Sequence, residues 1–255
     1  MLHMGSIFTD GFGLGPSGNV KITAGSMSLA SSSSIRAAGE SDGPAGGLTI
    51  HVTDAATLTD HSALQVSAFN NNGGDITLTA GGNIRLSSSE ITAQASQDGG
   101  SINLLTPAAA DGTKVPGSSV VYLFKSTLTA EATAGNGGNI IIDPRFVVLN
   151  RSPITANANA AGSGGNINVV STFFFASQSP VTASSPLGPQ GTVVIAALEV
   201  DLTSSLIPLS LSLLGAEAQL PEDCAVKLPG GMSSFIVFGR GGLPLEPGGF
   251  LPSTP

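Results

Sequence analysis

Short stretches in which every second residue is aliphatic recur along the chain, and each one follows a glycine. This alternation is typical of a β-strand with one buried face. The inward positions are then pairs such as Ile76/Leu78, Ile140/Ile142 and Ile167/Val169. The seven copies read GNVKIT (18–23), GLTIHV (47–52), GDITLT (74–79), GSINLL (100–105), GNIIID (138–143), GNINVV (165–170) and GTVVIA (191–196).

A second motif, Ser-x-aliphatic-x-small, keeps step with the first. Its aliphatic residue, for example Ile91, Ile154 or Val181, is predicted to form a further inward ladder. A less regular apolar segment lies between the two motifs, as in Ile84/Leu86 and Val147/Leu149. The copies of the second motif read SSIRA (33–37), SALQV (62–66), SEITA (89–93), STLTA (126–130), SPITA (152–156), SPVTA (179–183) and a looser SLIPL (205–209).

Together the motifs define a repeat of about 27 residues with three short strands. A single coil of this length buries too little apolar surface to offset the backbone entropy it loses, so neighbouring coils must stack. Equivalent strands then run parallel, and crossovers between parallel strands are almost always right-handed. The sequence therefore predicts an all-β fold, a right-handed parallel β-helix (solenoid) of about seven coils.

The repeat also predicts how the chain is divided. The spacing from Gly100 to Gly138 is 38 residues, and the surplus indicates a loop insertion at about 106–117. We expect the shaft to occupy residues 1–209, and residues 210–255 to form a C-terminal cap and a Pro/Gly-rich tail. An uncovered β-helix end would expose unpaired strand edges. Ile7 lies 28 residues before Ile35, so the chain starts within a coil and we expect a C-terminal fragment of a longer protein.

Composition narrows the functional classes. The chain has 34 glycines, a net charge of −8 and only 10% charged residues, against about 25% in an average globular domain. Sparse cations argue against a nucleic-acid partner. The N-terminus, MLHMGSIFTDGFG, is not a signal peptide, and the apolar run 206–214 is too short for a transmembrane segment. The lone Cys224 has no partner for an internal disulfide, and no cofactor is expected.

Candidate chemistry is sparse. The formal GxGxxG from Gly13 to Gly18 contains Pro16 and precedes a strand, so we interpret it as a turn. The densest ionisable patch is a weak candidate for a metal or catalytic site. His51 follows the first strand of its repeat and Asp60 precedes the third, so we favour solvated turn residues. The patch comprises His51, Asp54, Asp60 and His61.

Parallel β-helices include polysaccharide lyases and hydrolases, whose sites gather carboxylates and basic residues on one outer face. Here the predicted outer positions hold mainly Thr, Asn and Ser. We therefore predict that the protein is not an enzyme. A polysaccharide-active β-helix enzyme is the alternative, and three carboxylates clustered with an Arg or Lys would favour it.

The GNGGNI and S-x-I-x-A period resembles the shaft of filamentous-haemagglutinin-like exoproteins of the two-partner secretion class, of the cyanobacterial type. The tail resembles their C-terminal signature: Cys224 precedes SSFIVFGRGGLPLEPGGFL at 233–251, which contains Gly239, Arg240, Gly241 and Gly242.

This resemblance implies a non-catalytic, adhesin-like shaft that is extracellular or on the outer surface of a Gram-negative cell. It implies an outer-membrane transporter as partner of the full-length protein, and a glycan or a surface protein as ligand. End-to-end self-association of the rods is a further expected contact.

Overall fold

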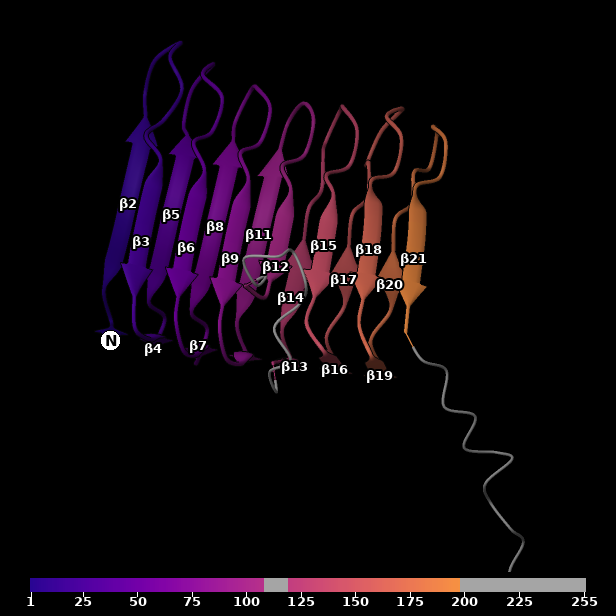
Figure 1. The fold of residues 1–255 in the computed structure, drawn as a ribbon. Coiled ribbons are helices and arrows are strands. Elements are labelled where there is room, and N and C mark those ends of the chain that lie inside the picture. The colour runs from indigo at the N-terminus through magenta and orange to yellow at the C-terminus, as the bar shows by residue number, and fades with distance from the viewer. Residues whose placement is uncertain (108–118, 198–255) are drawn as a thin grey trace, which may run out of the picture. The chain divides into compact units, whose positions relative to one another are not determined.

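The computed structural model describes residues 1–107 and 119–197, which form three parallel β-sheets of seven strands each (Figure 1). Each sheet takes one strand from every coil, and those 186 residues contain no helix. The predicted all-β parallel β-helix of about seven coils, with three strands per coil, is therefore confirmed.

The chain visits the three sheets in the constant order A, B, C. Sheet A contains β1 (Leu2–His3), β4 (Met27–Ala30), β7 (Ala56–Thr59), β10 (Ile84–Ser87), β13 (Val120–Phe124), β16 (Phe146–Asn150) and β19 (Phe173–Ser177). Sheet B contains β2 (Ser6–Gly11), β5 (Ser34–Gly39), β8 (Ala63–Ala68), β11 (Glu90–Ala95), β14 (Thr127–Thr129), β17 (Ile154–Thr155) and β20 (Val181–Thr182). Sheet C contains β3 (Val20–Ala24), β6 (Leu48–Val52), β9 (Ile76–Ala80), β12 (Ile102–Leu105), β15 (Ile140–Asp143), β18 (Asn166–Val170) and β21 (Thr192–Ala196).

The core consists of the aliphatic ladders that the alternation predicts. In sheet C, each inward residue pairs with the inward residue of the next coil, as Ile140 does with Ile167. In sheet B, Ile154 lies between Leu128 and Val181. Val181 packs against the core but is only partly buried. The other predicted ladder residues are buried, namely Ile76, Leu78, Ile91, Ile140, Ile142, Ile154, Ile167 and Val169.

One detail differs from the sequence prediction. In the second coil, the recurring glycine is Gly46 and not Gly47. Leu48 pairs with Val20 on one side and with Ile76 on the other, and each of these residues lies two positions after its glycine. The sequence has two adjacent glycines there, and the aliphatic Leu48 lies two residues after Gly46, as Ile76 does after Gly74.

Val193 and Ile195 continue the inward ladder of sheet C, because they pair with Ile167 and Val169, although each is 40% exposed. They lie on β21, which has a described neighbouring strand on one side only.

The corner between sheets B and C requires glycine. A Cβ atom at Gly138 would overlap the carbonyl oxygen of Gly100, the equivalent glycine of the preceding coil. The same overlap occurs in every pair of the stack, which contains Gly46, Gly74, Gly100, Gly138, Gly165 and Gly191. The recurring glycine thus allows backbones of successive coils to approach closely.

The corner between sheets A and B requires the serine of the second motif. Ser126 is buried; its Oγ donates to the Phe124 carbonyl (2.9 Å) and accepts the Ser89 N–H of the preceding coil (3.2 Å). The Ser126 N–H in turn donates to Ser152 Oγ of the following coil, at 3.1 Å. The residue before the serine is left-handed, with φ of 63° at His61 and 48° at Lys125. The serine hydroxyls therefore satisfy backbone groups that this tight corner buries.

Several predictions concern residues outside those described. The insertion at about 106–117 falls between β12 and β13, and its first residue, Thr106, donates to the Asp143 carbonyl at 3.0 Å. Residues 108–118 of that loop lie outside the described ranges. So do residues 198–255, which include the predicted cap and the predicted motif of Cys224, Gly239, Arg240, Gly241 and Gly242.

The buried ladder of sheet B generates a first prediction. Ile154→Asp places a carboxylate between Leu128 and Val181, where an unpaired charge is costly. We expect the cooperative thermal transition followed by circular dichroism to be lost. Thr155→Asp, one residue along on the outer face, should keep the transition. Parent-like melting of Ile154→Asp would show that the ladder is misplaced.

The glycine stack generates a second prediction. Gly138→Ala should lower the free energy of unfolding by about 1–3 kcal/mol, because the new methyl group pushes two coils apart. Gly13→Ala is the matched control, since nothing lies within 4 Å of a Cβ atom there. Urea denaturation of both variants measures the difference. Equal stability of the two variants would contradict close stacking at this corner.

Candidate functional site

The outer face of sheet B carries aligned polar side chains. In the S-x-I-x-A motif the aliphatic residue points inward, so its neighbours point outward. Strand pairing stacks the fourth residue of the motif coil on coil, as Thr129 on Thr155. The row begins with Phe8 and is polar from the second coil onward, where it reads Arg36, Gln65, Thr92, Thr129, Thr155 and Thr182.

A groove of about 350 Å³ runs across successive coils where the chain leaves sheet B. Small residues in register, Gly39, Ala68, Ala95 and Ala132, are among those that line it. Ala68 and Ala95 are buried, in phase with the inward residues of their strands, and the residues before and after each of them are more exposed. The groove therefore follows the position of the repeat at which this row of glycine and alanine recurs.

The remaining lining residues are mostly polar, and they also recur coil by coil. Residues that precede the small row contribute Ser67, Gln94 and Glu131. Phe69 is the one aromatic residue of the lining and is 66% exposed. Residues that follow the small row are Glu40, Phe69, Ser96, Thr133 and Asn159. The lining thus offers hydroxyl, amide and carboxylate groups and an open aromatic ring.

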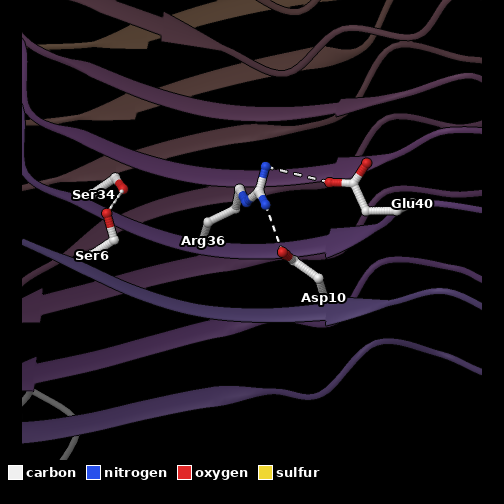
Figure 2. A network of polar contacts seen from close by, with 5 residues as sticks. All are labelled: Ser6, Asp10, Ser34, Arg36 and Glu40. Carbon is white, nitrogen blue, oxygen red and sulfur yellow. Dashed lines mark hydrogen bonds and ion pairs between the residues drawn. The ribbon is translucent and has the colours of Figure 1, made fainter.

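An ion-pair network lies beside the groove on the first two coils (Figure 2). Arg36 contacts Asp10 at 2.6 Å and Glu40, a lining residue, at 3.3 Å. Nearby, Ser34 Oγ donates to Ser6 Oγ at 3.1 Å. The guanidinium of Arg36 therefore forms ion pairs with two carboxylates. It compensates the charge of Asp10, whose side chain is only 9% exposed.

This network bears on the enzyme alternative, for which the sequence criterion was three carboxylates and a cation on one outer face. The structure brings two carboxylates to Arg36, and both are in ion pairs with it. Other acids of this face have amide partners: Gln65 donates to Glu90 (2.7 Å), and Asn157 donates to Glu131 (3.3 Å). The arrangement is suited to hydrogen bonding with a ligand rich in hydroxyl groups.

The four ionisable residues noted in the sequence lie at three different places. His51 is on the outer face of β6, in register with Thr23 and Thr79. Asp54 follows β6, at the corner between sheets C and A, where Ser26 Oγ donates to it at 3.5 Å. Asp60 and His61 form the left-handed corner between sheets A and B, with φ of 55° and 63°. Among residues 1–107 and 119–197, no three His, Cys, Asp or Glu side chains are grouped to hold a metal ion.

At the turn into sheet C, asparagine side chains at equivalent positions of successive repeats contact one another. Asn166 donates both its backbone N–H (3.2 Å) and its side-chain amide (3.1 Å) to Asn139 Oδ1 of the preceding coil. In the first two coils Gly47 N–H donates to Asn19 Oδ1 at 2.7 Å. These polar side chains bind neighbouring coils together, which gives them a structural role.

The fold thus defines a β-helix repeat protein with a polar groove along one sheet. Comparison of the chain with protein-family models, curated proteins and solved structures found no match. Within the part of the chain that the structure describes, no helix is long and apolar enough to cross a membrane.

Proposed function

We propose that this chain is the non-catalytic, ligand-binding shaft of a secreted, surface-associated exoprotein, similar to the filamentous-haemagglutinin-like class. The support is the stacked repeat together with the tail motif from Cys224 to Gly242. Such a shaft is an adhesin-like spacer that acts at the outer cell surface. Its full-length form requires an outer-membrane transporter as partner, and its rods can associate end to end.

The ligand of this shaft is proposed to be an extended neutral glycan lying in the groove of sheet B. The observation that supports it is the recurrence of polar lining residues in successive coils, from Glu40 to Asn159. Neighbouring strands are spaced by about 4.8 Å, so a polymer along the groove meets a new set of polar groups at each step. The exposed ring of Phe69 offers an apolar face for a sugar ring.

Charge favours a neutral glycan over an acidic one. Glu40 and Glu131 contribute carboxylates to the lining, whereas no Lys or Arg of the described residues lines the groove. Arg36 beside it is paired with Asp10 and Glu40. An acidic polymer would meet like charge, and like-charge juxtaposition selects against the wrong partner.

This proposal predicts the effect of removing the ring. Phe69→Ala should weaken retardation of the protein in gels containing a soluble neutral polysaccharide, such as a β-glucan or a mannan, by about tenfold in Kd. Phe175→Ala removes a half-exposed ring from sheet A and should leave retardation unchanged. If no neutral polysaccharide retards the parent protein, the glycan assignment is wrong.

The same preparation tests the non-catalytic assignment. The parent chain is incubated with acidic and neutral polysaccharides, and new reducing ends are measured over time. We expect none. Turnover of an acidic polysaccharide would overturn the assignment and favour the polysaccharide-active alternative.

A further inference from the structure

The outer face of sheet A changes character along the solenoid. In the third and fourth coils it carries small polar side chains such as Thr57, Thr59 and Ser87. From β13 onward two of the outward rows are aromatic or aliphatic, because Tyr122 follows Arg85 in register and Phe175 follows Val148. The third row, which contains Ser87, continues with Phe124 and then returns to polar residues at Asn150 and Ser177. We call this surface the aromatic face; its rings are those of Tyr122, Phe124, Phe146, Phe173 and Phe175.

The rings of this face lie against one another. Phe146 and Phe173, on adjacent coils, have centroids 5.2 Å apart and planes 10° apart. Phe173 and Phe175 are 6.4 Å apart, with planes at 12°. Phe146 and Phe173 therefore pack against each other, whereas Phe175, on the last described strand of sheet A, is 50% exposed.

Cations surround the aromatic face. Arg85 lies over Tyr122 (5.4 Å), Lys125 over Phe124 (5.2 Å) and Arg145 over Phe146 (5.5 Å). A fourth cation, Arg151, directly follows β16 and hydrogen-bonds Gln178 at 3.0 Å. All four side chains are exposed. The described residues contain only two other Lys or Arg side chains, Lys21 and Arg36.

The distribution of charge is therefore uneven. The chain has a net charge of −8, yet none of the described strands of sheet A contains an Asp or a Glu. At the edge of the face, Glu90 shares a hollow with Lys125, and its carboxylate accepts a hydrogen bond from Gln65. A cationic rim on an acidic protein selects an anionic partner.

We propose that the aromatic face docks on the headgroup boundary of an anionic lipid bilayer. Aromatic and aliphatic side chains enter the boundary between headgroups and acyl chains, while surrounding cations pair with lipid phosphates. The combination of apolar rings and surrounding cations favours lipid over an acidic glycan, because a bilayer boundary offers acyl chains beside phosphates. The surface lies on a different sheet from the groove, so this inference does not depend on glycan binding.

The chain contains its own reporter for this surface. Tyr122 is its one tyrosine, and there is no tryptophan, so intrinsic fluorescence arises at the aromatic face. The full chain is mixed with vesicles of equal parts phosphatidylglycerol and phosphatidylcholine, and with vesicles of phosphatidylcholine alone. We expect co-sedimentation with the anionic vesicles only, reversal at high salt, and protection of Tyr122 from the neutral quencher acrylamide.

Matched variants locate the contact. Each cation near an anionic surface strengthens binding about fivefold, so Lys125→Gln should weaken vesicle binding by that factor. Lys21→Gln removes the same charge from exposed Lys21 on sheet C and should have no effect. The combined change of Arg85, Lys125 and Arg145 to Gln should weaken binding by about a hundredfold.

Three results would overturn the proposal. The first is equal binding to neutral vesicles, and the second is equal loss of binding in Lys125→Gln and Lys21→Gln. The third is protection of Tyr122 by heparin without any binding to anionic vesicles, which would assign the surface to an acidic glycan. Neutral-polysaccharide retardation of the same variants should be unchanged, which separates this test from that of the groove.

Discussion

Every coil of this protein depends on its neighbours for its backbone hydrogen bonds. A strand within a coil has no partner in that coil; the Ile102 N–H, for example, donates to the Asn139 carbonyl of the next coil at 2.8 Å. The corners follow the same rule, since Ser126 and Asn139 use side-chain oxygens to accept N–H groups from adjacent coils. Coils must therefore approach to strand-pairing distance around the whole circumference. That requirement excludes any Cβ atom at Gly138 and its equivalents.

This constraint divides the residues of each repeat into two kinds. Inward ladders and corner positions are fixed by stacking, and they account for the recurring Gly, Ser and aliphatic residues. Outward positions bear no such restriction, so each sheet has its own surface. Sheet B combines a polar face with the groove over Ala68 and Ala95, whereas sheet A ends in stacked phenylalanines such as Phe146 and Phe173. The two surfaces proposed for binding lie on these outward rows and on the groove beside them.

The sequence predicts most of the fold because period and alternation report burial directly. Ile91 and Ile154 are assigned to the core by position in the repeat alone, and both are buried. The register at Gly46 follows from the spacing of the aliphatic residues and not from the glycines alone, since Leu48 lies two residues after Gly46 as Ile76 does after Gly74. The sequence indicates that His51 and Asp60 belong to different parts of the coil. It does not give the distance between them, because that distance depends on the width of the coil.

The two candidate surfaces are harder to read from the sequence, for a physical reason. Phe146 and Phe173 are 27 residues apart, and their contact exists only once coil register is known. Likewise, Glu40 and Asn159 line one groove although they are far apart along the chain. The recurrence of Gly or Ala after the second motif is a signal for the groove. Its meaning depends on knowing that those residues stack.

The central claim is that stacking between coils, and not contacts within one coil, holds this protein together. Amide hydrogen–deuterium exchange tests it most directly, at residues such as Ala56 in sheet A, Leu128 in sheet B and Ile102 in sheet C, whose N–H groups each donate to the next coil. The account predicts slow exchange in all three sheets of the inner coils, with equivalent amides of adjacent coils similarly protected. Fast exchange of these amides, or protection confined to a single sheet, would contradict it.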